Sequence, residues 1–64
     1  METATDIINS AGGRAAVANL IGVGYDAVRF AERQGILPAA WFDLLESRLG
    51  QPLPRHLFSF KGMA

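Results

Sequence analysis

Three arginines between residues 14 and 34 are the side chains of this chain best suited to bind an anion. Arg29 and Arg33 are four residues apart, so one helix would carry both on the same face. A guanidinium presents a planar fork of N–H donors that matches carboxylate and phosphate groups. Arg14 follows two glycines, where we expect another helix to begin. Any basic surface of this chain must combine this region with the tail, which carries Arg55 and Lys61 and no acidic residue.

The other polar residues give little basis for catalysis. The chain has no cysteine and one histidine, His56, which excludes a disulfide framework and a cysteine-based zinc site. Asp43 and Glu46 share a helix face, an arrangement that can support acid–base chemistry. We interpret them as a solvent-facing pair beside Arg48. We therefore expect no enzymatic activity, no cofactor, no metal and no small-molecule ligand.

Length and charge narrow the class of protein. The chain has 64 residues, which indicates one domain, and half of them are hydrophobic, as in a globular protein. Six basic and six acidic side chains give zero net charge, which argues against strong non-specific binding to nucleic acid. No apolar run is long enough to span a membrane. Acidic residues and no basic ones near the start argue against a signal peptide, so we expect a cytoplasmic protein.

Glycines separate four predicted helices that must position these side chains. Thr5 is the predicted cap of the first, and Gly22 and Gly24 supply unusual backbone angles between the second and the third. In the third helix Asp26, Arg29, Glu32 and Arg33 are predicted to face outward. The predicted helices cover residues 5–11, 14–21, 25–34 and 38–49. Each has an apolar stripe that we expect to face inward. In chain order the stripes are Ile7, Ile8 and Ala11; Val17, Ala18 and Ile21; Val28 and Ala31; and Trp41, Leu44, Leu45 and Leu49.

The tail, residues 51–64, differs from the helical region, residues 1–50. Its prolines favour extended backbone around Leu53, and an apolar cluster follows. We expect an extended arm or a short strand that serves as a dimerisation arm. The candidate dimer interface consists of Phe42, Leu57, Phe58 and Phe60.

One spacing pattern points to a family. Ala18 is a small residue where two helices would cross, Gly22 lies four positions later, Val23 plugs the turn, and Val28 holds the next helix. This pattern resembles the helix-turn-helix of the Cro and phage-repressor class. The resemblance implies an all-α, small four-helix domain with an extended C-terminal arm.

A narrower resemblance covers about half of the chain. The region from Ile8 to Trp41 is similar to the carph-isopro, or YdaS-like, prophage antitoxin-regulator domains. The matching pieces are Gly12-Gly13, Ala16-Val17-Ala18, Gly22-Val23-Gly24, Val28 and Leu37-Pro38-Ala39-Ala40-Trp41. The chain departs from the family at Gly24, where serine is usual, at Ala31, where tryptophan is common, and at Tyr25 and Phe30, which are commonly polar.

The resemblance implies a sequence-specific transcriptional regulator, bacterial or phage-encoded, that binds double-stranded DNA as a homodimer. The third helix would enter the major groove, with Arg29 reading guanine and Arg33 contacting phosphate. Arg14 would contact phosphate at the start of the second helix. Asp26 either accepts a hydrogen bond from the N4 amino group of cytosine or pairs with Arg29. The implied DNA-binding residues are Arg14, Gly24, Tyr25, Asp26, Arg29, Phe30 and Arg33.

A second interpretation remains open. Zero net charge and two aromatic residues on the third helix also fit a protein–protein interaction module, such as a phage-encoded modulator, that keeps the fold without binding DNA. In that case Phe30 would pack against the tail or a partner rather than against a base.

Overall fold

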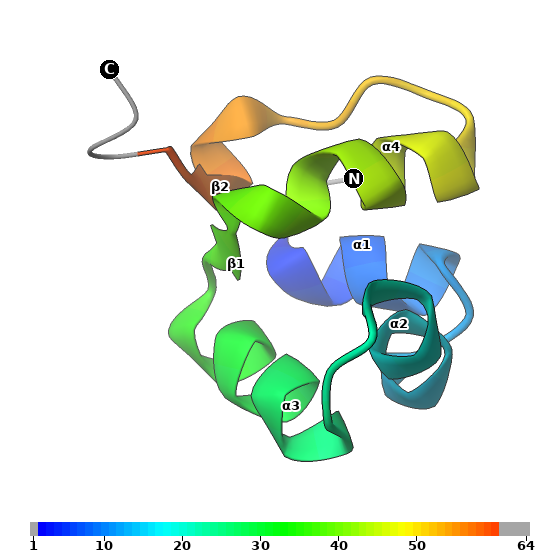
Figure 1. The fold of residues 1–64 in the computed structure, drawn as a ribbon. Helices are drawn as coiled ribbons and strands as arrows, with labels where there is room; N and C mark the ends of the chain where they lie inside the picture. The colour runs from blue at the N-terminus through cyan, green and yellow to red at the C-terminus, as the bar shows by residue number, and fades with distance from the viewer. Residues whose placement is uncertain (1, 61–64) are drawn as a thin grey trace.

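The computed structural model describes residues 2–60 of the chain. The fold is mostly helical, with two short 3₁₀ turns and a pair of two-residue strands (Figure 1). The elements in chain order are α1 (Ala4–Ser10), α2 (Arg14–Ile21), α3 (Tyr25–Gln34), β1 (Leu37–Pro38), a 3₁₀ turn (Ala39–Trp41), α4 (Phe42–Leu49), a second 3₁₀ turn (Arg55–Leu57) and β2 (Phe58–Ser59).

A capping box starts α1. The Thr3 hydroxyl accepts a hydrogen bond from the backbone N–H of Asp6, and the Asp6 carboxylate accepts one from the N–H of Thr3. The prediction that Thr5 caps this helix is therefore wrong, because Thr5 already lies inside the first turn and Thr3 has the extended backbone of a cap. Backbone N–H groups, that of Glu2 first, lower the pKa of the Asp6 carboxyl.

The connection between α2 and α3 depends on one left-handed glycine. Gly22 has φ +88°, and its N–H donates to the carbonyl of Ala18, which ends α2. Gly24 has φ −75° and ordinary extended backbone, so the prediction of unusual angles at both glycines holds only for Gly22. Val23 between them packs, partly buried, against the core. The bounds of α2 and α3 match the predicted helices.

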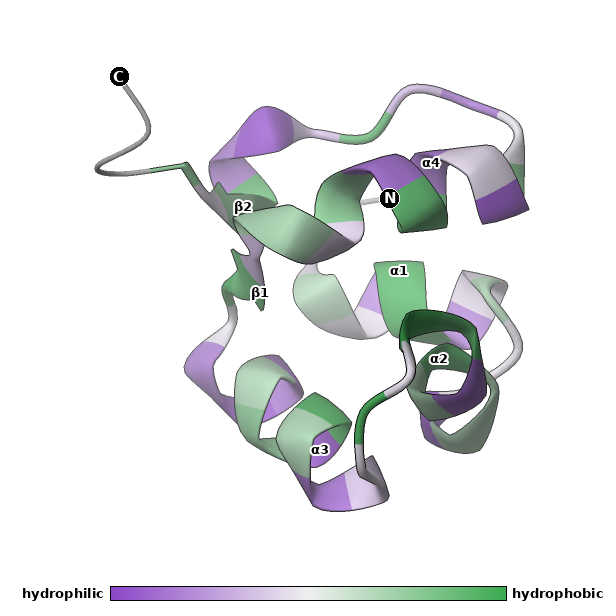
Figure 2. Ribbon diagram, in the orientation of Figure 1, coloured by the Kyte–Doolittle hydropathy of each residue, from purple (hydrophilic) through white to green (hydrophobic). Residues whose placement is uncertain are grey.

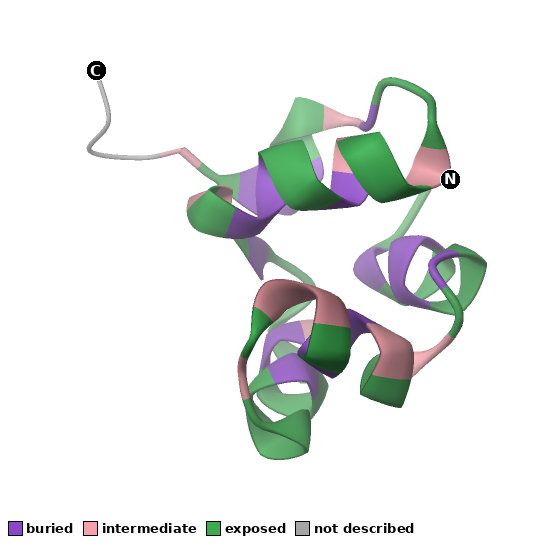
Figure 3. Cartoon of the chain, turned by 45° about the vertical axis from the view of Figure 1, so that its right-hand side comes forward, coloured by how far each residue is buried: buried purple, intermediate pink, exposed green. Residues whose placement is uncertain are grey.

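The core lies where α1 is enclosed by α2 and α3 on one side and α4 on the other (Figure 1). Buried positions line the inner faces of the helices, while the outer faces of α3 and α4 are exposed (Figure 3). Hydropathy follows the same division, with polar segments directed outward (Figure 2). The largest fully buried side chains are Ile7, Ile8, Val17, Val28, Leu37 and Leu45.

The start of α4 differs from the prediction of one helix over 38–49. Pro38 is extended and pairs with Ser59 in the strand ribbon, so the chain enters α4 through the 3₁₀ turn. Of the predicted stripe, Trp41 and Leu45 are buried and Leu49 is half-buried against the core. Phe42 is buried, whereas Leu44 is 44% exposed, so Leu44 was wrongly assigned to the inward face.

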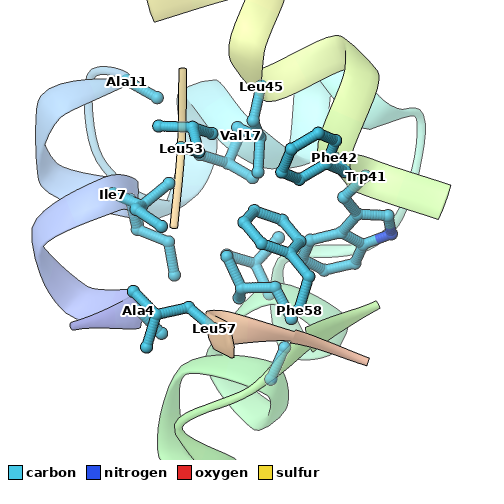
Figure 4. Close-up of a cluster of buried hydrophobic side chains, with 14 of the residues drawn as sticks. Ala4, Ile7, Ala11, Val17, Trp41, Phe42, Leu45, Leu53, Leu57 and Phe58 are labelled. Carbon is cyan, nitrogen blue, oxygen red and sulfur yellow. The ribbon is translucent and has the colours of Figure 1, made fainter. Parts of the chain in front are cut away.

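The tail is part of the core. Strands β1 and β2 are parallel, with Leu37 opposite Phe58 and Pro38 opposite Ser59. Leu53, Leu57 and Phe58 are buried in the same cluster as the side chains of α1 and α4 (Figure 4). Of the two expectations for this tail, the short strand is confirmed at Phe58–Ser59, and a free extended arm is wrong for residues 53–59, because Leu53, Leu57 and Phe58 pack into the core. Residues 61–64 of the predicted tail lie outside the described residues.

The aromatic side chains of the candidate dimer interface pack against one another within one chain. The Phe42 ring meets Phe58 and Phe60 edge-on, at centroid distances of 5.0 and 5.2 Å. The Arg55 guanidinium lies 4.9 Å from the Phe42 centroid and 5.2 Å from that of Phe60. Phe42, Leu57 and Phe58 are buried and Phe60 is half-buried, so these side chains do not form a free interface.

The loop after α4 is fixed by Glu46. Its carboxylate accepts a hydrogen bond of 3.0 Å from the backbone N–H of Leu53. The interpretation of Glu46 as a solvent-facing partner of Asp43 is therefore wrong, because Glu46 is half-buried and satisfies the backbone of the returning chain.

Candidate functional site

The outer face of α3 carries the exposed side chains predicted for the site. Tyr25, Arg29, Phe30 and Arg33 are all exposed there, because Val28 and Ala31 occupy the inner face. Phe30 is the most exposed large hydrophobic residue, at 62%, and it does not pack under the tail. The structure thus brings the predicted α3 residues onto one accessible surface.

Gly24 and Asp26 lie at the exposed N-terminal end of the same helix. Gly24 is the N-cap, and it provides no side-chain hydrogen bond to the first turn. Asp26 is 4.0 Å from the Nε atom of Arg29, with 93% of its side chain exposed. A pair so distant and so exposed constrains Arg29 weakly, so that guanidinium can reorient toward a ligand.

Arg14 is not a free cation at the start of α2. Its Nε atom forms an ion pair with the Glu32 carboxylate on α3, and its Nη1 atom donates a 3.4 Å hydrogen bond to the Tyr25 hydroxyl. These contacts raise the pKa of Arg14, the bond to Tyr25 contributing first and Glu32 second. Two of the predicted site residues, Arg14 and Tyr25, are therefore joined through their side chains.

Glu32 is a site residue that the sequence analysis missed. Its side chain is 12% exposed, and the hydrogen bond from Arg14, followed by a contribution from the Thr5 hydroxyl, lowers the pKa of its carboxyl. The prediction that Glu32 faces outward is wrong, because positions 28, 31 and 32 form an i, i+3, i+4 stripe along the packed side of α3. A partly buried carboxylate beside an apolar stripe is stabilised by a paired cation. The position of Glu32 next to that stripe was the signal in the sequence that could have identified the pair.

Several hollows border this face of the molecule, and two of them bear on the site. A polar one, of about 420 Å³, is lined by Thr5, Arg14, Arg29, Glu32 and Arg33. Three guanidinium groups and one carboxylate give its lining an excess of positive charge, which suits an anionic group. The second, of about 440 Å³, is mostly apolar and lies between the C-terminal half of α3 and the strand ribbon; its lining includes Phe30, Ile36 and Pro38.

The comparisons with protein-family models, curated proteins and solved structures found no match. Within residues 2–60, no three His, Cys, Asp or Glu side chains lie close enough together to hold a metal ion. None of the helices that the structure describes is both long and apolar enough to cross a membrane.

Proposed function

We propose that this chain is a sequence-specific DNA-binding transcriptional regulator of the helix-turn-helix class, in which α2, the Gly22 turn and α3 form the DNA-binding unit. The observation that carries the proposal is the outer face of α3, where Arg29 and Arg33 are exposed beside the Arg14 end of α2. Guanidinium groups from two helices thus line one hollow.

The dimensions of α3 fit the major groove. Its ten residues span about 15 Å, and the groove is about 12 Å wide and accepts an α-helix. In this proposal Arg29, which is weakly held by Asp26, grips guanine O6 and N7, and Arg33, one turn later, contacts a phosphate. Gly24 lets the backbone at the start of α3 approach the DNA closely, since nothing lies within 4 Å of its Cβ position.

Charge favours specific over non-specific binding. Non-specific affinity grows with the number of phosphates that basic residues neutralise, and this chain has six acidic side chains against six basic ones. One copy offers few base contacts, so we propose that two copies bind a palindromic site as a homodimer. The buried Phe42, Leu57 and Phe58 cannot join them, so the dimer contact uses another surface.

Selection of bound sites from random DNA duplexes, followed by affinity measurement, tests the proposal. We expect Arg29→Ala to weaken binding to the selected site by about 10- to 100-fold and to relax the preference at one base pair, the loss of one bidentate contact. Arg33→Ala should weaken binding to all DNA sites by a similar factor. The slope of log affinity against log salt concentration should become shallower by about one ion. Arg48→Ala, which removes an exposed guanidinium from α4, is the matched control and should bind like the wild type. Absence of wild-type binding to any duplex at low salt would refute the proposal.

A protein–protein interaction module is the second candidate, and one observation favours it. The exposed Phe30 and Ile36 border the apolar hollow, which can receive an apolar side chain from a partner protein. Phe30→Ser separates the two functions. A DNA-binding protein should lose at most an apolar contact with one thymine methyl after this change and keep its arginine contacts, whereas a partner protein that docks on Phe30 should lose most of its affinity.

A further inference from the structure

We propose that Glu32 is a specificity-determining residue of the DNA-binding surface: by pairing with Arg14 it neutralises that guanidinium and keeps binding to random duplex weak. The inference rests on the proposed function. Of the three arginines beside the hollow, Arg14 is held by a carboxylate of the same surface, while Arg29 and Arg33 are not held in this way.

The contacts of Arg14 define what remains for DNA. The Nε atom binds Glu32 and the Nη1 atom donates to Tyr25, so the side chain has one fixed direction across the start of α2. A guanidinium has further N–H donors, and these two bonds leave some of them for a phosphate oxygen. With 42% of its side chain exposed, Arg14 still reaches solvent. Its remaining donors can therefore still contact a phosphate.

The charge of Glu32 opposes indiscriminate contact. Its side chain is 12% exposed and its carboxylate pairs with Arg14, so a phosphate that approaches Arg14 meets a pair with no net charge. Counterion release, which drives non-specific binding, is correspondingly small for a neutral pair. In a chain with zero net charge, removal of this one carboxylate changes the balance of the surface substantially.

Glu32→Gln removes the charge and keeps the shape, since the amide oxygen can still accept the hydrogen bond from Arg14. We expect this variant to bind random duplex about three- to tenfold more tightly at low salt and to show a salt dependence steeper by about one ion. The ratio of affinities for selected and random sites should fall. Thermal unfolding, followed through Trp41 fluorescence, establishes that the variant is folded.

Arg14 variants show whether the effect passes through the pair. In an Arg14→Ala background Glu32→Gln should give a smaller gain in random binding, because it removes a repelling carboxylate but releases no guanidinium. The double variant removes the neutral pair as a whole and should change the random-duplex salt dependence by much less than Arg33→Ala does, a comparison that does not need the single Glu32→Gln variant to fold.

Three results would overturn the inference. One is a folded Glu32→Gln protein whose random-duplex affinity is unchanged or lower. Another is a gain of equal size with and without Arg14, which would assign the effect to plain repulsion of DNA by Glu32. The third is a loss in the Arg14→Ala, Glu32→Gln double variant as large as that of Arg33→Ala. Failure of the proposed function is distinct from all three, since it appears as absence of wild-type binding before any variant is compared.

Discussion

At the scale of single residues, the contacts of Arg14 decide how the candidate surface works. Two side chains of α3, Tyr25 and Glu32, hold this guanidinium of α2, while Arg29 and Arg33 project from the same helix without a comparably close partner. The three arginines therefore differ: Arg14 is held in an ion pair, and Arg29 and Arg33 are exposed. This division follows from side-chain contacts rather than from charge count.

The pair also predicts how stability depends on pH. The folded pKa of Glu32 lies below its ordinary value of 4.5, so the unfolded chain binds more protons between the two values. The contribution of the pair is therefore fully present above about pH 5 and is lost as the pH falls through the folded pKa. We expect the melting temperature to fall on acidification and Glu32→Gln to flatten part of that fall, as measured by circular dichroism at a series of pH values.

Arg14→Ala is the complementary control, because it removes the largest cause of the lowered Glu32 pKa. Arg14→Ala should therefore flatten the fall in melting temperature over the same acidic pH range. If the melting temperature falls identically with acidification in the wild type and both variants, this pair contributes nothing to the pH dependence of stability.

At the scale of elements, the turn between α2 and α3 sets the angle at which the exposed face is presented. Gly22 closes α2 with left-handed backbone, and Gly24 opens α3 from extended backbone without a side-chain cap. Nothing lies within 4 Å of a Cβ at either glycine, so substitutions there report backbone conformation rather than crowding. The two positions form a matched pair for testing the turn.

We expect opposite effects at the two glycines. Gly22→Ala should reduce the free energy of unfolding by about 1–2 kcal/mol, because an alanine is strained at φ +88°. Gly24→Ser should raise it by about 0.5 kcal/mol, because serine caps the helix and restricts the unfolded chain. Urea denaturation of both variants measures these changes. Equal effects at the two positions would contradict the conformations described for this turn.

At the scale of the whole molecule, the tail completes a core that the four helices leave open. Leu53, Leu57 and Phe58 are buried against α1 and α4, and the stacking of Arg55 on Phe42 and Phe60 covers the outer edge of the cluster. A domain of 64 residues buries a small core, so each of these side chains is a large share of its stability.

Removal of the tail therefore should unfold the protein rather than convert a dimer into a monomer. Phe58→Ala should cost about 3–5 kcal/mol, comparable with the whole stability expected for a domain of this size. We expect this variant, and a chain that ends at Gly50, to lose helical circular dichroism at 25 °C. Leu44→Ala, at an exposed position of α4, is the control and should remain folded. A folded chain that ends at Gly50 would show that the tail is dispensable for the core.

By itself the sequence determined the local structure and the face of α3 that reaches solvent. The bounds of α2 and α3 match their prediction, because glycines end these helices and the spacing of Val17, Val28 and Ala31 defines their inner faces. Signals of this kind act over a few residues, so they can be read from a single chain. The exposure of Arg29 and Arg33 follows from the same periodicity.

Only the tertiary structure decided where the tail goes, where α4 begins and which cation Glu32 binds. The pairing of Leu37 with Phe58 joins residues far apart in the chain, and apolar periodicity does not distinguish burial within one chain from burial against a second copy. That pairing holds Pro38 in extended backbone, so α4 begins only after a 3₁₀ turn. The candidate surface of Arg14, Arg29 and Arg33 is correspondingly redefined, because the packing of α2 against α3 places Glu32 beside Arg14.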